Sequence, residues 1–205
     1  MKLKEAERIA RELVEELKPF SLQIEVAGSI RRKRPEVHDI DIVMVPDFHY
    51  LNRSHGLGYD MRKVIPEIAD QVHLNGPKLA RFSYHGADVD LYYARPETFT
   101  TLLLIRTGSK DNNIHLCAAA KRRGWKLRAN GEGLFDERGR RIAGSSEEEI
   151  YRLLRLPYQP PEKRDPYEFF RLASSARQNM ELTEPPQELH AQIVRIISRL
   201  PTEEG

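Results

Sequence analysis

Two aspartates, Asp39 and Asp41, lie two residues apart in an otherwise apolar stretch. Residues 37–45 read Val-His-Asp-Ile-Asp-Ile-Val-Met-Val, which is typical of a strand, and side chains two apart on a strand project from the same face. Adjacent carboxylates repel each other and lose hydration unless a cation lies between them. A divalent metal ion with oxygen ligands would meet that need. The alternative is a strand end at a sheet edge, where both acids are solvated.

A third carboxylate is available on a second short apolar strand, residues 87–94. If that strand lies beside residues 37–45, Asp90 can join the first two acids. Three such acids can hold two Mg²⁺ ions about 3.5–4 Å apart, an arrangement used for in-line displacement at phosphorus. Asp88 has the same parity on the strand, so the pattern alone leaves either acid eligible.

The segment Gly28-Ser29-Ile30-Arg31-Arg32 directly follows a predicted strand at residues 22–26. Glycine allows close approach of the backbone to a phosphate, serine adds a hydroxyl, and arginine adds a planar fork of donors. These residue types predict a phosphate-binding turn. The alternative is an ordinary tight turn with two solvated arginines.

Helices and further strands must position these groups. Residues 3–18 carry apolar side chains on one helical stripe that ends at Pro19. The other elements predicted in the first half are a loop at 47–59, a helix at 60–72, and strands at 78–84 and 87–94 joined at His85-Gly86. Those predicted in the second half are a helix at 109–123 capped by Ser109, a hairpin at 131–141, a helix from Ser145-Ser146 through Leu154, a loop at 156–166, and helices at 167–181 and 186–199.

The chain has 205 residues, enough for one domain or two small subdomains, and a formal charge of only +2. Residues 100–141 nevertheless hold 10 Lys and Arg against 4 Asp and Glu, which predicts a local contact with a polyanion. The single cysteine, Cys117, excludes a disulfide framework and a cysteine-based zinc site. No apolar run reaches membrane-spanning length. We therefore expect a soluble, cytoplasmic protein with no membrane partner.

Taken together, the turn at residues 28–32, the Asp39-x-Asp41 pair and Asp90 resemble the palm of the nucleotidyltransferase superfamily. Three later blocks narrow the resemblance to DNA polymerase family X, the polymerase beta-like enzymes. These blocks are Thr107 to Asn113, Lys126 to Phe135, and Glu147 to Glu162. The resemblance covers about residues 3–165, in order and at compatible spacing.

The resemblance implies an α+β fold. Residues 1–98 would form the catalytic palm, with a small mixed or antiparallel sheet and helices on one side. Residues 99–165 would form a mostly helical, nucleotide-selecting, thumb-like subdomain, and residues 166–205 a C-terminal helical extension. Relatives carry a lyase domain and a helix–hairpin–helix segment ahead of the palm, and we expect neither here because the sequence starts at the palm's first helix.

The activity implied is template-directed addition of nucleotides to a primer 3′-hydroxyl, with two Mg²⁺ ions as cofactors and Mn²⁺ as a substitute. The expected partners are primer–template or gapped DNA and dNTPs, with NTPs as a further substrate. The expected role is the filling of short gaps in DNA repair.

The resemblance also assigns site residues position by position. The third catalytic acid precedes a Leu-Tyr pair, which selects Asp90 over Asp88. The residues implied to bind metal and act in catalysis are Asp39, Asp41 and Asp90, with Asp90 also assisting deprotonation of the primer hydroxyl. Those implied to bind the nucleotide are Gly28, Ser29, Arg32, Ile105, Arg106, Thr107, Gly108 and Asn113. Those expected to contact DNA are Lys78, Arg81, Lys121, Arg122 and Arg123, and for the last three a solvated basic face is the alternative.

One departure keeps other functions open. Ile105 and Arg106 stand where many relatives have two aromatic residues that help to exclude ribonucleotides. This difference leaves room for a non-templated nucleotidyltransferase that acts on RNA ends or a small molecule. A noncatalytic nucleic-acid-binding module is a further alternative, although all three carboxylates of the pattern are present.

Overall fold

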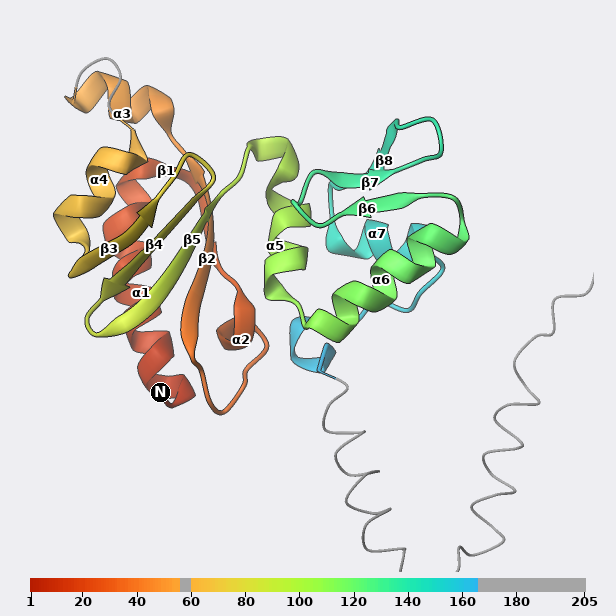
Figure 1. Cartoon of the computed structure of the whole chain (residues 1–205), viewed down its shortest axis with the longest axis horizontal. Coiled ribbons are helices and arrows are strands. Elements are labelled where there is room, and N and C mark those ends of the chain that lie inside the picture. The colour runs from red at the N-terminus through yellow and green to blue at the C-terminus, as the bar shows by residue number, and fades with distance from the viewer. Residues whose placement is uncertain (56–59, 166–205) are drawn as a thin grey trace, which may run out of the picture. The chain divides into compact units, whose positions relative to one another are not determined.

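Asp39 and Asp41 begin the second strand of a five-stranded sheet in the computed structural model, which describes residues 1–55 and 60–165. The strand order is β1-β2-β5-β4-β3 (Figure 1). β2 pairs with β5 in parallel, and the other neighbouring pairs are antiparallel. The strands are β1 Ser21–Val26, β2 Asp39–Pro46, β3 Gln71–Asn75, β4 Leu79–Tyr84 and β5 Ala87–Tyr93.

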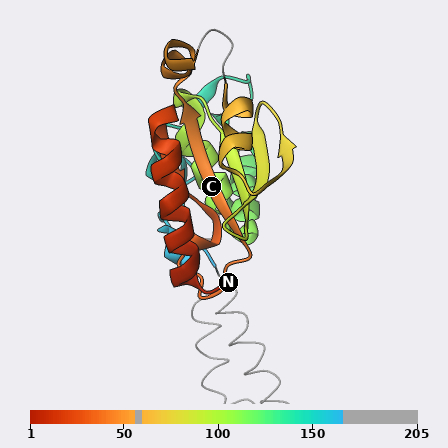
Figure 2. The ribbon, with the colours of Figure 1, turned by 90° about the vertical axis from the view of Figure 1, so that its left-hand side faces the viewer.

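The two faces of β2 have different neighbours, as strand alternation requires. Ile40, Ile42 and Met44 lie in the main core with the buried side chains of α1 (Leu3–Leu17) and α4 (Met61–Ile68). Figure 2 shows α1 lying along this side of the sheet. The opposite face carries Asp39 and Asp41, and this face is the one that positions the site.

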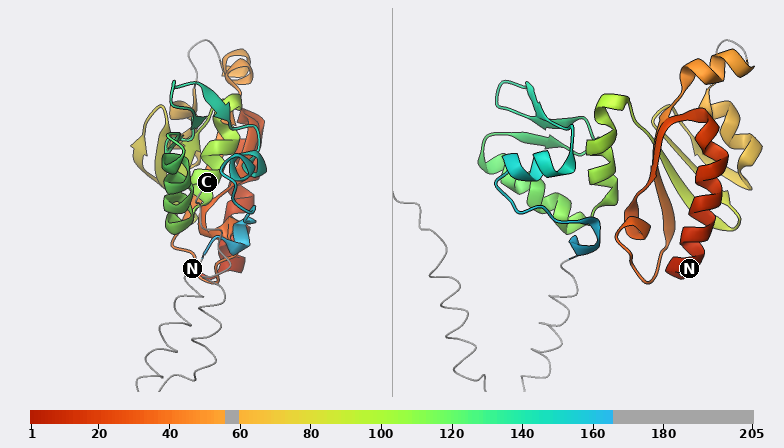
Figure 3. Two further views of the ribbon diagram at one scale, coloured as in Figure 1. Left: turned by 90° about the vertical axis from the view of Figure 1, so that its right-hand side faces the viewer. Right: turned by 180° about the vertical axis from the view of Figure 1, so that it is seen from behind.

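A second group of elements follows β5. Helix α5 (Phe99–Thr107) begins it, and Phe99, Leu102 and Leu103 pack in a core cluster with Val43 and Val45, which continue the Asp41 face of β2. The group continues with α6 (Lys110–Arg122), the antiparallel sheet β6-β7-β8 and α7 (Glu147–Leu153), as Figure 3 shows. These elements share a further core cluster. The three short strands are β6 Lys126–Arg128, β7 Gly133–Phe135 and β8 Arg141–Ala143.

The structure confirms the α+β class and the mixed sheet. It also confirms the predicted capping of α6, because the Ser109 side chain accepts a hydrogen bond from the backbone N–H of Asn112. Ser146 caps α7 in the same way, through the N–H of Glu149. The remaining short helices are η1 Lys18–Phe20, α2 Gly28–Arg31, α3 Phe48–His55, η2 Pro96–Thr98 and η3 Pro161–Lys163.

Two predictions for the first half were wrong. Residues 47–59 were expected to be a loop, but Phe48–His55 is helix α3. The carboxylate of Asp47 caps the start of this helix, because it accepts a hydrogen bond from the backbone N–H of Tyr50 at 2.9 Å. The helix expected at 60–72 ends at Ile68, and Gln71–Asn75 is the edge strand β3. Val72 and Leu74 of that strand do alternate with polar residues, but the helical spacing of the preceding residues was extended as far as residue 72.

The chain divides into Met1–Asp165 and Pro166–Gly205. The helices expected at 167–181 and 186–199 lie outside the described residues, and the subdomain boundary at residues 98/99 stays a prediction. No helix in the described part of the chain is both long enough and apolar enough to cross a membrane.

Candidate active site

The carboxylates that were expected to act together lie on the neighbouring strands β2 and β5. Because the strands are parallel, the register places Asp41 opposite Asp90 and Asp39 opposite Asp88. Asp39 and Asp88 are exposed, whereas Asp41 and Asp90 are half-buried. Burial, followed by the negative charges of Asp39 and Asp90, raises the pKa of Asp41 to about 7. Asp41 therefore takes up a proton near neutral pH unless a cation offsets these charges.

Gly28 lies against Asp41 and leaves no room for a side chain. It begins α2 with a φ of +56°, a conformation that side-chain-bearing residues rarely adopt. A Cβ atom built on Gly28 would lie 2.0 Å from Oδ2 of Asp41. The backbone of the predicted phosphate turn therefore lies directly beside the buried carboxylate.

Arg81 and Tyr92 hold the carboxylate of Asp90. Nε and Nη2 of Arg81 donate to its two oxygens at 2.9 and 3.2 Å, and the Tyr92 hydroxyl donates at 2.9 Å. Within residues 1–55 and 60–165, no three His, Cys, Asp or Glu side chains lie together in a way that could hold a metal ion. In this structure the third carboxylate is paired with a cation of the protein itself, Arg81.

The donor chemistry of the site nevertheless fits a divalent cation. Its acidic groups all offer carboxylate oxygens, the ligands that Mg²⁺ and Mn²⁺ prefer. Burial first, and then the negative charges of Asp39 and Asp90, raise the pKa of Asp41, and the neighbouring arginines do not fully offset them. Asp39, Asp41 and Asp90 are the residues that could hold such a cation, and Asp90 would have to exchange its contact with Arg81 for the metal.

Most of the residues that were expected to bind a nucleotide line a cavity of about 530 Å³. Arg32 and Arg106 line it, and their positive charges also lower the pKa of Asp41, so the cavity and the carboxylates are neighbours. The other predicted residues on its wall are Ile105, Gly108 and Asn113. Sequence reasoning missed the remaining four lining residues, which are Lys110, Ile114, Cys117 and Ala129.

The other three predicted nucleotide ligands lie beside this cavity rather than on its wall. Thr107 is fully buried, and its Oγ1 accepts a hydrogen bond from Arg31 at 2.7 Å while its carbonyl accepts one from Arg32. Gly28 lies against Asp41, as described. The hydroxyl of Ser29 is buried and has no hydrogen-bond partner in the described part of the chain. Buried hydroxyls are normally paired, so the Ser29 hydroxyl is free to bind a ligand oxygen.

Two side chains of the cavity wall also keep unpaired polar atoms. Asn113 donates from Nδ2 to the carbonyl of Ile105 at 2.8 Å, and its buried Oδ1 has no partner among the described residues. The Arg106 guanidinium lies over the ring of Tyr92, 4.1 Å from its centroid, and its buried Nε has no partner there either. Arg106 thus connects the cavity with the tyrosine that donates to Asp90.

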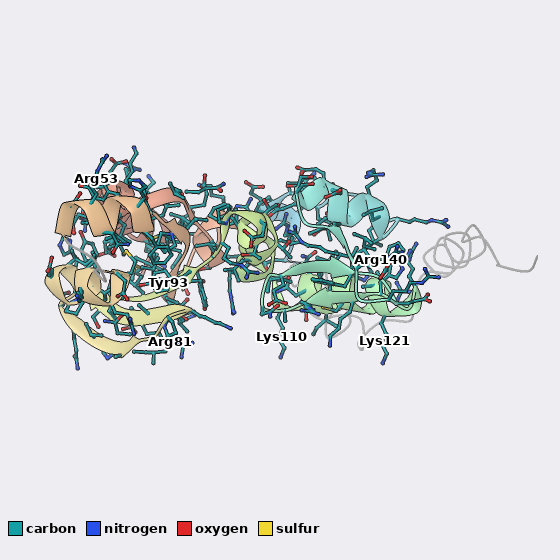
Figure 4. All side chains as sticks on the ribbon, turned by 90° about the horizontal axis from the view of Figure 1, so that it is seen from above. Arg53, Arg81, Tyr93, Lys110, Lys121 and Arg140 are labelled. Atoms are coloured by element: carbon teal, nitrogen blue, oxygen red, sulfur yellow. The ribbon has the colours of Figure 1, made fainter. Side chains whose placement is uncertain are left out.

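The residues expected to contact DNA are not gathered in one place. Lys121 and Arg122 end α6 and are exposed, Arg123 is half-buried, and none of the three forms an ion pair within the described residues. Figure 4 shows Lys121 extending from α6 on the same side as Lys110. Arg81 is exposed but bonds to Asp90.

Lys78 lies apart from these residues. It is exposed and lines a second cavity of about 430 Å³, together with Tyr93. That cavity therefore lies near the other end of β5 from Asp88 and Asp90.

Sequence reasoning missed a set of ion pairs that bind the phosphate turn to the end of the described chain. Nη1 of Arg31 donates to Glu147 at 2.7 Å, and Glu147 also pairs with Arg164, whose side chain is completely buried. Burial alone would raise the pKa of Glu147, but the hydrogen bonds from Arg164 and Arg31 hold it below its ordinary value. Glu147 begins the third block of the family resemblance, but its spacing from Arg31 gave no signal of the contact.

Known proteins are similar to this chain in both sequence and fold. Residues 102–165 match the family model described as DNA polymerase beta thumb. Over 188 residues, the chain is 32% identical to the DNA polymerase/3′-5′ exonuclease PolX of Bacillus subtilis (strain 168). The match covers 89% of this chain but only 32% of that protein, so the chain spans about a third of the length of this relative.

Solved structures share the fold at lower identity. The ternary primer/template (P/T) complex of Leishmania infantum polymerase beta matches with a TM-score of 0.62 and 21% identity, over 81% of this chain and 77% of the other. The ternary gap complex of the same polymerase matches with a TM-score of 0.63 and 20% identity, over 81% of this chain and 71% of the other. The α+β architecture is therefore that of polymerase beta.

The close approach of Gly28 to Asp41 gives a first prediction. We expect Gly28→Ala to lower the free energy of unfolding in urea by roughly 2–4 kcal/mol, because the left-handed backbone costs about 1–2 kcal/mol for alanine and the new methyl group displaces a buried carboxylate. The matched control is Gly86→Ala, since Gly86 has a φ of +74° but nothing within 4 Å of its Cβ position. Equal losses in the two variants would contradict the close contact with Asp41.

The raised pKa of Asp41 gives a second prediction, for protein kept in a metal chelator. Between about pH 4 and pH 7 the folded state binds the Asp41 proton more tightly than the unfolded state, so this group lowers stability as the pH rises. Asp41→Asn removes the effect. The difference in free energy of unfolding, Asp41→Asn minus wild type, should therefore increase by on the order of 2 kcal/mol from pH 5 to pH 8. A difference that does not change with pH would show that Asp41 titrates normally.

Proposed function

We propose that this chain, which is related to the DNA polymerases of family X, is a template-directed DNA polymerase that extends a primer 3′-hydroxyl from dNTPs. Its role in the cell would be the filling of short gaps during DNA repair, in the cytoplasm. The 32% identity with PolX over 188 residues supports the reaction class. The single cysteine is in keeping with a reducing compartment.

One observation carries the proposal. Two arginines, Arg32 and Arg106, lie on the wall of the 530 Å³ cavity and within electrostatic reach of Asp41. A site for nucleotidyl transfer needs donors for a triphosphate on one side and acidic groups for cations on the other. The arginines provide the first, the acids of β2 and β5 provide the second, and the charges of the arginines act on Asp41.

The remaining groups have roles that their unpaired atoms allow. Ser29 and Arg32 would hold the β- and γ-phosphates, and the free hydroxyl of Ser29 is available for this purpose. Thr107 and Gly108 would support the sugar. Asn113 would contact the base edge through its unpaired amide oxygen.

The cofactor of the proposal is Mg²⁺, with Mn²⁺ as a substitute, and two ions would be held by Asp39, Asp41 and Asp90. These ions supply Lewis-acid stabilisation of the charge that develops on the phosphate being transferred. Arg81 would leave Asp90 for the metal to bind. Since Arg81 is exposed, its guanidinium is free to contact the primer backbone instead.

The proposed DNA partner is a primer–template or a gapped duplex. Lys121, Arg122 and Arg123 are cations without an acidic partner in the described part of the chain, as expected for residues that bind phosphates. Lys78 and Arg81 are proposed to contact the primer. NTPs are a further substrate of the proposal, because Ile105 provides no aromatic wall against the 2′ side of the sugar.

Because Ile105 is not aromatic, a second function is also tested, that of a non-templated nucleotidyltransferase. A primer-extension assay with and without the template strand, using dNTPs and NTPs in parallel, distinguishes the two. Template-directed incorporation is the expected result. Extension at equal rates without a template would favour the alternative, and no incorporation with any divalent metal would leave only a binding module.

Substitutions at the two acids of β5 test the assignment of the third carboxylate. Asp90→Asn should lower the incorporation rate by at least about 100-fold, because the two-metal site then lacks one of its ligands. The matched control is Asp88→Asn, on the same strand face but exposed, which should stay within about threefold of the wild type. Similar losses in both variants would contradict the choice of Asp90.

The salt dependence of DNA binding tests the basic end of α6. Replacing Lys121, Arg122 and Arg123 by Gln should weaken binding to all sequences alike and reduce the slope of log K against log salt by about 0.9 for each phosphate that is no longer neutralised. The control replaces Lys4 and Arg11, two exposed cations of α1, and should leave the slope unchanged. If the α6 variant also keeps the wild-type slope, these cations form a solvated face.

A further inference from the structure

Asp165, the last residue that the structure describes, contacts the arginine of the proposed triphosphate site. Its Oδ2 accepts a hydrogen bond from Nε of Arg32 at 2.8 Å. The side chains of Arg32 and Asp165 are 16% and 14% exposed, so the pair is largely shielded from water. Arg34 lies at 3.7 Å from the same oxygen. The pair joins residues 133 positions apart in the sequence.

The position of Asp165 is fixed by the residue before it. Arg164 is completely buried, where it pairs with Glu147 and donates from Nε to the carbonyl of Gln159 at 2.8 Å. Its own carbonyl accepts a hydrogen bond from the hydroxyl of Ser109. The backbone on which Asp165 is carried is therefore attached both to α7 and to the turn that begins α6.

The hydrogen bonds of Arg32 explain what this contact does. A guanidinium has five N–H donors in a rigid plane. Asp165 takes the donor on Nε, and the carbonyl of Thr107 takes one on Nη1. No other hydrogen bond of this guanidinium forms within residues 1–55 and 60–165, although Arg32 lines the 530 Å³ cavity. Two partners thus fix the plane of the fork and leave three donors for an anion.

We propose that Asp165 is a positioning residue for the triphosphate of the incoming nucleotide, acting through Arg32. The inference rests on the proposed function and adds a residue to it. A pre-oriented arginine loses less side-chain freedom when it binds a phosphate, so the affinity gain appears in binding rather than in the chemical step. The opposite role, in which Asp165 competes with the phosphate for Arg32, predicts tighter binding when the carboxylate is removed.

The test measures binding of inorganic tripolyphosphate and of a dNTP to the full chain by titration calorimetry, with a dideoxy-terminated primer–template present for the dNTP. Asp165→Asn should raise both dissociation constants by about tenfold, since the charged hydrogen bond that orders Arg32 is removed. Asp165→Glu should recover part of the affinity. The matched control is Glu162→Gln, an exposed acid of the same segment, which should bind as the wild type does.

A double-mutant cycle with Arg32→Gln decides whether Asp165 acts through Arg32. In the Arg32→Gln background, Asp165→Asn should change the dissociation constants by less than about twofold. An equal loss in both backgrounds, an unchanged affinity, or tighter binding in Asp165→Asn would overturn the inference. In primer extension, Asp165→Asn should raise KM about tenfold and change kcat by less than about twofold, which a general loss of structure would not do.

Melting temperatures show whether each variant is folded. If Asp165→Asn does not fold, Asp165→Glu and Arg32→Lys replace it, and the lysine variant should weaken tripolyphosphate binding to the same degree because an ammonium cannot contact both Asp165 and Thr107 as a fork does. The binding assay also separates this inference from the proposed function. A wild type that binds tripolyphosphate but extends no primer contradicts the polymerase, whereas normal extension with unchanged affinity in Asp165→Asn contradicts only the role of Asp165.

Discussion

The mutual repulsion of carboxylates on two parallel strands is the constraint on which the site depends. The register of β2 and β5 places half-buried Asp41 opposite Asp90, with exposed Asp39 on the same face. Such an arrangement destabilises the fold unless cations surround it. Arg32 and Arg106 lower the pKa of Asp41, and Arg81 pairs with Asp90, but burial and then the charges of Asp39 and Asp90 still raise the pKa of Asp41 to about 7. The unbalanced charge is what would make a divalent metal bind here.

Much of the fold follows from local pattern. Alternation of apolar side chains predicted β1, and a nearly continuous apolar run predicted β2, whose two faces both pack in core clusters. The cap residues of α6 and α7 predicted where those helices begin. The prediction failed at the exposed edge strand β3, where the alternation of Val72 and Leu74 with polar residues is short and directly follows a helical pattern. It also failed at α3, since the composition of residues 47–59 is typical of a loop. The only signs of the helix were the cap at Asp47 and one fully buried residue among its described side chains, Leu51.

The pairing of the acids on β2 and β5 was predictable, but the ion pairs around them were not. Spacing on a strand determines the face on which a side chain lies, so Asp41 and Asp90 could be proposed as neighbours. Spacing does not determine which partner a long side chain meets. The hydrogen bonds of Arg81 with Asp90 were not predicted, and the contacts of Arg31 with Glu147 and of Arg32 with Asp165 span 116 and 133 residues. Such ion pairs are set by the tertiary fold, and no local periodicity reports them.

The most direct measurement is the number of protons released when Mg²⁺ binds to the protein without DNA, obtained by calorimetry in buffers of different ionisation enthalpy. A carboxyl group must lose its proton to bind a metal. With the pKa of Asp41 near 7, release should approach about one proton at pH 6 and fall close to zero at pH 8.5. Asp41→Asn should abolish the pH-dependent part. Binding of Mg²⁺ with no proton release at either pH would contradict the account, because the metal would then not bind to a carboxyl group with a raised pKa.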